Sequence, residues 1–247
     1  MVDIEARRQM MQDELDLHKP HKERNMMGQF ATPYDLAVEI MEYVRPFCPQ
    51  GTMTFLEPAI GTGVFYSAFK RVFGGNAGRA LGFEVDPYYL NPARELWSGH
   101  DVEFRCEDFL KAPNGGEELD LIVTNPPYVR HHHIPREVKE RLKIAVKKET
   151  GINVSGLAGM YCYFMLLSAK WLKDGGLSCW LVPNEFMDVN YGKAVRQYLT
   201  EKVDLLQIHR FGVENLKFKD ALVSSCVVIF KNKRPSSNKV VFTDGEH

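Results

Sequence analysis

The feature that most constrains the fold of this chain is the alternation of short apolar runs with amphipathic segments of helical period. Such alternation is typical of α/β domains in which helices cover both faces of a doubly wound, mostly parallel sheet. The runs that we expect to form strands are residues 54–56, 80–83, 102–104, 119–124, 177–182, 203–211 and 221–231. The last two, of which the second is a long β-branched run, are expected to close this seven-stranded sheet as an antiparallel pair.

We expect three parts along the 247 residues, a length sufficient for one large domain. Residues 1–27 form a charged helix and loop, residues 28–232 the α/β domain, and residues 233–247 a polar linker or the start of a further region. Within the domain, residues 160–172 are apolar almost all round, which predicts a buried helix.

Charge and cysteine content exclude several classes of protein. With 31 Lys and Arg against 32 Asp and Glu, the net charge is −1, so a nucleic acid partner requires a local basic face or a region that this chain lacks. The five cysteines show no CxxC spacing, which favours reduced thiols in a cytoplasmic protein over a disulfide framework or a structural zinc. We find no apolar signal segment at the N-terminus and no run long enough for a membrane span.

The segment Asn125–Tyr128, Asn-Pro-Pro-Tyr, follows the apolar run 119–124 directly. The Asn125 amide oxygen and a proline-flanked carbonyl can accept the two hydrogens of an exocyclic amino group, and the Tyr128 ring can stack on its base. The alternative is an ordinary strand-to-loop turn with a buried tyrosine.

Three further segments follow expected strands. The turn 57–63 is not a full GxGxxG motif and lacks a phosphate-binding lysine, and its leading glutamate suits a positively charged ligand. Glu84, about 20 residues on, stands where a carboxylate accepts from a ribose diol, with Asp86 as the competing candidate. Asp108 and Phe109 could bind an adenine amino group and ring, although an exposed Asp beside a buried Phe is the simpler interpretation.

All four segments fall at the carboxyl ends of expected strands. In a doubly wound sheet, ligands bind beyond these ends at the point where the strand order reverses. The sequence therefore predicts that the four segments converge on one site.

The order of these segments resembles the S-adenosylmethionine-dependent N6-adenine DNA methyltransferases of gamma type, found in TaqI-type and PstI/BsuBI-type restriction–modification systems. The resemblance rests on Gln29–Pro33, Glu57–Gly63, Glu84, Asp108–Phe109 and Asn125–Tyr128, and it runs from about Gly28 to Phe230. The continuations Val129–His133 and Ser155–Tyr161 are similar to the PstI/BsuBI branch.

The resemblance implies a class I methyltransferase, Rossmann-like fold with S-adenosylmethionine as methyl donor, S-adenosylhomocysteine as product and no metal. The donor would contact Thr32, Glu57, Ala59, Gly61, Gly63, Glu84, Val85, Asp108, Phe109, Asn125 and Phe164. Thr32, Glu57 and Ala59 would lie at its methionine end, and Glu84 would hold the ribose. The implied catalytic residues are Asn125, Pro126, Pro127, Tyr128 and Phe218, the last packing on the extruded target base opposite Tyr128.

The expected reaction needs positioning rather than a strong base. The lone pair of adenine N6 is delocalised into the ring, and two acceptors, Asn125 and the Pro126 carbonyl, would pull the nitrogen toward sp³ geometry for in-line attack on the methyl group. Because the target atom is inaccessible inside a duplex, base flipping is expected.

The implied partner is double-stranded DNA, with a separate target-recognition domain or subunit. The rivals are a glutamine N5-methyltransferase acting on protein, which shares Asn-Pro-Pro-Tyr, and a non-catalytic donor-binding subunit that needs a specificity partner. The histidines at 131–133 suit a loop better than a metal site. The basic residues at 139, 141, 143, 147 and 148 suggest a solvated helix face, with phosphate contact as a second possibility.

Overall fold

The computed structural model describes residues 3–211, 225–236 and 239–245. Its centre is an eight-stranded sheet of order β3-β2-β1-β4-β5-β7-β6-β8. The strands are β1 (Met53–Glu57), β2 (Ala77–Phe83), β3 (Val102–Arg105), β4 (Leu119–Thr124), β5 (Leu172–Pro183), β6 (Asp204–Arg210), β7 (Ser225–Lys231) and β8 (Val241–Asp244). The first five strands pair in parallel, and β7 runs antiparallel to both β5 and β6. The expected α/β class and antiparallel closing pair are confirmed.

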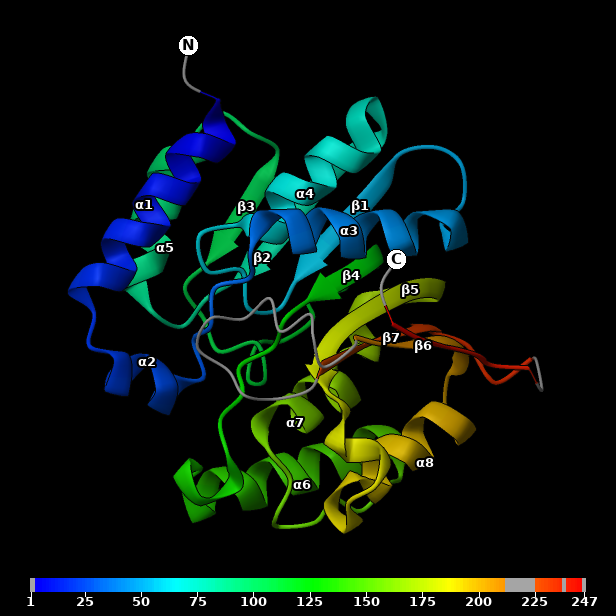
Figure 1. Cartoon of the computed structure of the whole chain (residues 1–247). Helices are drawn as coiled ribbons and strands as arrows, with labels where there is room; N and C mark the ends of the chain where they lie inside the picture. The colour runs from blue at the N-terminus through cyan, green and yellow to red at the C-terminus, as the bar shows by residue number, and fades with distance from the viewer. Residues whose placement is uncertain (1–2, 212–224, 237–238, 246–247) are drawn as a thin grey trace.

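Helices cover both faces of the sheet (Figure 1). They are α1 (Ile4–His18), α2 (His21–Met27), α3 (Tyr34–Val44), α4 (Val64–Phe73), α5 (Pro87–Leu96), α6 (Arg136–Thr150), α7 (Met160–Leu167) and α8 (Lys193–Glu201). Alternate residues of each central strand face opposite sides, so Phe55 and Leu121 join the apolar core under α3, α4 and α5, whereas Leu56 and Ile122 join the core under α6, α7 and α8. Among the described residues, no helix is both long and apolar enough for a bilayer crossing.

Two elements differ from the sequence expectation. The helix expected over 160–172 ends at Leu167, and β5 begins at Leu172, five residues earlier than expected. The Asn232 side chain donates to the backbone oxygens of Ala169 and Leu172, which holds the chain out of the helix. The sheet also has an eighth strand, β8, which pairs in parallel with β6 inside the segment expected to be a linker.

The order of the strands places a switch point between β1 and β4. From β1 the chain proceeds outward to β2 and β3, and from β4 it proceeds outward in the other direction to β5. The connections therefore leave a crevice beyond the carboxyl ends of β1 and β4, where open α/β sheets bind their ligands.

Gly82 on β2 allows the turn after β1 to lie against the sheet. A Cβ atom at Gly82 would stand 2.2 Å from Ile60 Cδ1 and 2.9 Å from Ile60 Cβ, and the Ile60 amide donates to the Phe83 oxygen at 2.8 Å. We expect Gly82→Ala to lower the free energy of unfolding by about 1–3 kcal/mol through overpacking. Chemical denaturation measures this loss, and Gly75→Ala is the control because its Cβ meets nothing within 4 Å. Equal stability of the two variants would contradict the prediction.

Candidate functional site

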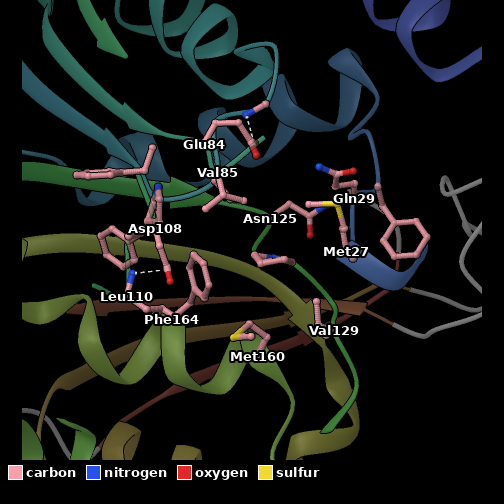
Figure 2. A pocket seen from close by; sticks show the side chains of 18 of the residues that line it. Met27, Gln29, Glu84, Val85, Asp108, Leu110, Asn125, Val129, Met160 and Phe164 are labelled. Carbon is pink, nitrogen blue, oxygen red and sulfur yellow. Dashed lines mark hydrogen bonds between the residues drawn. The ribbon is translucent and has the colours of Figure 1, made fainter. Parts of the chain in front are cut away.

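A cavity of about 320 Å³ opens at the carboxyl edge of the sheet (Figure 2). The turns after β1, β2, β3 and β4 each contribute to its wall. The remaining wall comes from two sides: α1 with the chain from Met27 to Ala31, and the helices α6 and α7. The structure therefore brings together segments that the sequence predicted to meet, and it adds wall residues from α1 and α6 that the sequence did not predict.

Most of the predicted site residues line this cavity. Those that line it are Ala59, Gly61, Glu84, Val85, Asp108, Phe109, Asn125, Pro127 and Phe164. Those that lie in or beside the same turns but outside the lining are Thr32, Glu57, Gly63, Pro126 and Tyr128. The predicted Phe218 lies outside the described residues.

The Glu84 side chain links the turns that follow β1 and β2 through hydrogen bonds. Its two carboxylate oxygens accept from the backbone amides of Gly61 at 3.1 Å and Asp86 at 2.9 Å. Burial raises the pKa of the Glu84 carboxyl, and these backbone hydrogen bonds oppose the rise. The rival candidate, Asp86, does not line the cavity: it caps α5 through the Tyr88 amide and accepts from Lys19 and Gln29.

An apolar slot with one carboxylate at its rim lies beside Glu84 (Figure 2). The rings of Phe109 and Phe164 stack, with centroids 5.5 Å apart and an interplanar angle of 25°. Asp108 accepts from the Leu110 amide at 3.1 Å. Val85 is 53% exposed, so an apolar side chain faces the opening. This combination suits a flat heteroaromatic ring that carries an amino group.

Asn125, directly after β4, lines the cavity (Figure 2). Its amide nitrogen donates to Thr32 Oγ1 at 3.1 Å. Its Oδ1 atom is buried and has no hydrogen-bond partner among the described residues. An unpartnered buried acceptor costs about 1–3 kcal/mol, so a ligand group that donated a hydrogen to this oxygen would remove that cost.

The Tyr128 ring lies behind Asn125 in an aromatic group. The Tyr128 hydroxyl donates to the Leu181 oxygen at 3.0 Å, which fixes the ring. The centroid of the Tyr128 ring is 6.1 Å from that of the Phe30 ring, which lines the cavity, and 6.5 Å from that of the Tyr161 ring.

The N-terminal helix α1 supplies site residues that sequence reasoning missed. Gln12 and Asp16 of α1 line the cavity, and Gln12 accepts from Thr62 of the glycine turn at 2.7 Å. Arg8, only 1% exposed, donates to Thr62 Oγ1 at 2.9 Å and pairs with Glu5 at 2.7 Å. The i, i+4 spacing of Arg8, Gln12 and Asp16 was the available signal, since it places all three on one helix face.

Glu57 is a buried carboxyl at the root of the glycine turn. Its Oε2 atom has no hydrogen-bond partner in the described part of the chain. Burial raises the pKa of Glu57 well above its ordinary value, and the charge of Arg8 opposes the rise. An unsatisfied acid at this place would be stabilised in its ionised form by a cationic ligand.

The comparisons with known proteins converge on methyltransferases. Residues 90–216 match the family model of the Eco57I restriction-modification methylase. The chain is 27% identical over 231 residues to type II methyltransferase M.AccI of Acinetobacter calcoaceticus, and 24% identical over 240 residues to M.PstI of Providencia stuartii. These matches cover 90% and 88% of this chain but only 39% and 45% of the relatives, so the chain spans less than half of their length.

Solved structures of similar fold include a class I S-adenosylmethionine-dependent methyltransferase from Listeria monocytogenes. It superposes with a TM-score of 0.77 at 17% identity, covering 100% of this chain and 74% of that one. The type IIG restriction endonuclease BpuSI superposes with a TM-score of 0.69 at 18% identity, covering 87% and 26% of the two chains. The fold is that of class I methyltransferases.

Gly28 supports the segment that carries Asn125. Its φ is +67°, and a Cβ atom would stand 2.4 Å from the Tyr128 amide nitrogen. We expect Gly28→Ala to push the Pro127–Tyr128 peptide away and to increase amide hydrogen exchange in residues 125–129. Gly151→Ala is the matched control, since Gly151 is also in the left-handed region, with a φ of +75°, and the nearest atom to an added Cβ is Lys202 Nζ at 3.9 Å. It shares the backbone strain of about 1–2 kcal/mol without the clash. Unchanged exchange at residues 125–129 in Gly28→Ala would count against this role.

The raised pKa of Glu57 predicts a pH-dependent stability. The unfolded carboxyl ionises near its ordinary pKa of about 4.3, whereas the folded one stays protonated to higher pH. The stabilisation that the protonated Glu57 side chain gives to the folded state is therefore fully present below the ordinary pKa. It is lost as pH rises toward the pKa of the folded state. Thermal unfolding should show Glu57→Gln gaining stability over the wild type from pH 4 to pH 8. Parallel pH curves for Glu57→Gln and the wild type would refute it, and Glu118→Gln, which removes a carboxyl at an exposed position, is measured beside them.

Proposed function

Because the chain belongs to the family of Eco57I restriction-modification methylases, we propose that it transfers a methyl group from S-adenosylmethionine to N6 of an adenine in DNA. The observation that carries this proposal is the unpartnered Oδ1 of Asn125, which Thr32 orients inside the cavity that Glu84 and Phe164 also line. An amino nitrogen is the kind of group that such an oxygen binds.

The cavity suits the proposed methyl donor. Glu84 has lone pairs free for ribose hydroxyls beyond the two amides it already accepts from. Val85, Phe109 and Phe164 offer apolar surface to an adenine ring, and Asp108 a carboxylate to its amino group. Glu57 lies buried beside the glycine turn, where it would favour the cationic methionine end. When bound, S-adenosylmethionine supplies an electrophilic methyl group on a sulfonium.

The chain's own groups then position the acceptor nitrogen. Asn125 Oδ1 and the Pro126 carbonyl accept its two hydrogens and draw its lone pair out of the ring plane. Thr32 contributes by fixing the amide, because it accepts from the Asn125 nitrogen and leaves only the oxygen to face the substrate. No proton needs to leave before the new bond forms, so positioning supplies most of the rate.

Access to the nitrogen requires the target base to leave the duplex. Flipping costs a few kcal/mol, and stacking on an aromatic side chain returns about 1–3 kcal/mol per ring. Tyr128 is the first ring proposed for this role, and Phe218 the second. A separate target-recognition domain or subunit is the proposed source of sequence specificity. With a net charge of −1, the attraction of this chain to DNA must come from a local basic face.

We expect Asn125→Ala to lower methyl transfer to unmethylated genomic DNA by about 10²–10³-fold. Binding of S-adenosylmethionine should fall far less than transfer, because most of the proposed donor contacts, among them Glu84, Asp108 and Phe164, stay in place. Transfer of tritiated methyl and calorimetric donor binding measure the two quantities, and mass spectrometry of the nucleosides identifies N6-methyladenine. Asn190→Ala, an exposed asparagine outside the cavity lining, is the control.

Two outcomes would overturn the proposal in different ways. Label in protein and none in DNA would indicate a glutamine methyltransferase. Donor binding without transfer, with or without a candidate specificity partner, would indicate a non-catalytic subunit.

A further inference from the structure

Basic side chains gather on one side of α6 and in the turn before it. Residues 130–148 contain seven Lys and Arg and two Glu, a net charge of +5, while the rest of the chain carries −6. At about 100° per residue, positions 136, 139, 143 and 147 fall within roughly 80° of each other around the helix. We call Arg130, Arg136, Lys139, Lys143 and Lys147 the basic strip.

The basic strip begins at the mouth of the cavity. Arg130 directly follows Val129, which lines the cavity and whose oxygen accepts from the Met160 amide at 3.0 Å. Val138, Arg141 and Leu142 bring α6 itself to the cavity wall. The helix therefore turns its apolar side to the site and the core, and its strip of cations lies on the flank of that side.

The strip has little compensating charge. In the part of the chain that the structure describes, its one ion pair joins Lys143 to Glu140 at 3.2 Å. Both partners are in contact with solvent, Lys143 partly and Glu140 more fully, so this pair contributes little stabilisation. Desolvation, and then the charges of neighbouring His133, His131, Arg130 and Lys139, lower the pKa of His132, as expected in a field of positive sign.

We infer that the basic strip binds the phosphates of the DNA backbone next to the flipped base. This inference rests on the proposed function, and it explains how a chain of net charge −1 approaches DNA at the correct edge. A net charge of −6 over the rest of the chain repels a polyanion, whereas the strip attracts it beside Asn125. Phosphate contacts set position and carry no base information, so the strip acts equally on all sequences.

The test compares two triple variants of the chain that lose the same charge. Lys139→Ala/Lys143→Ala/Lys147→Ala removes three of the five cations of the basic strip, all three on α6. The control, Arg7→Ala/Lys70→Ala/Arg71→Ala, removes cations from α1 and α4 on the other side of the sheet. Binding of a short fluorescent duplex is followed by anisotropy over a range of salt concentrations, with methyl transfer measured on the same duplex.

Each lost phosphate contact lowers the slope of log K against log salt by about 0.9. We expect the slope of log K against log salt for the strip variant to be smaller in magnitude by up to about 2.7. Its affinity for DNA should fall by the same factor on every duplex sequence. The control should keep the wild-type slope, and donor binding should be unchanged in both.

If the chain binds and methylates DNA but the strip variant and the wild type have equal salt slopes, the inference that the strip binds phosphates is wrong and the proposed function stands. A wild type that neither binds duplex at low salt nor transfers methyl would overturn the strip together with the proposed function. A loss of affinity that depended on the DNA sequence would also overturn the inference about the basic strip, because such a loss would mean that the strip contacts bases.

Discussion

The parallel pairing of β1 with β2 and β4 is the constraint on which the site depends. Leu56 of β1 pairs with Leu81 of β2 and with Ile122 of β4, so the three strands end nearly level. Their next residues therefore leave the sheet together, and the glycine turn, Glu84 and Asn125 reach one cavity. A shift of one strand by a single residue would reverse every side chain on it and separate the donor side from Asn125.

The site carries polar groups that do not help the fold. Glu57 is buried with one oxygen unpartnered among the described residues, and Asn125 Oδ1 shares that condition. The two apolar cores, one on each face of the sheet, offset such costs. The charge of Arg8 lowers the cost of burying Glu57. Arg8 also holds α1 against the glycine turn through its hydrogen bond to Thr62. In the proposed function Asn125 Oδ1 accepts from the target amine, and the charge of Glu57 favours the cationic end of the methyl donor, as expected where stability is given up for binding.

The alternation of apolar runs predicted the α/β class, the seven strands and the strand ends at which the site forms. It could not locate the start of β5, because the residues after Leu172 are Lys173–Gly176, a polar and glycine-rich stretch that is typical of a turn and forms an irregularity in the pairing with β4. It missed β8, which follows a polar segment and has only four residues, Val241–Asp244. The cavity walls from α1 and α6 arise by long-range packing, such as Arg8 and Gln12 on Thr62, and local sequence pattern carries almost no information about such contacts.

The most direct measurement is a crystal structure of the chain with S-adenosylhomocysteine. The account predicts the product's adenine between Val85 and Phe164, its ribose hydroxyls on Glu84, and its sulfur on the side of Asn125 Oδ1. A product bound elsewhere, or an Asn125 amide whose oxygen points away from the sulfur, would contradict the claim that one sheet edge joins donor and acceptor.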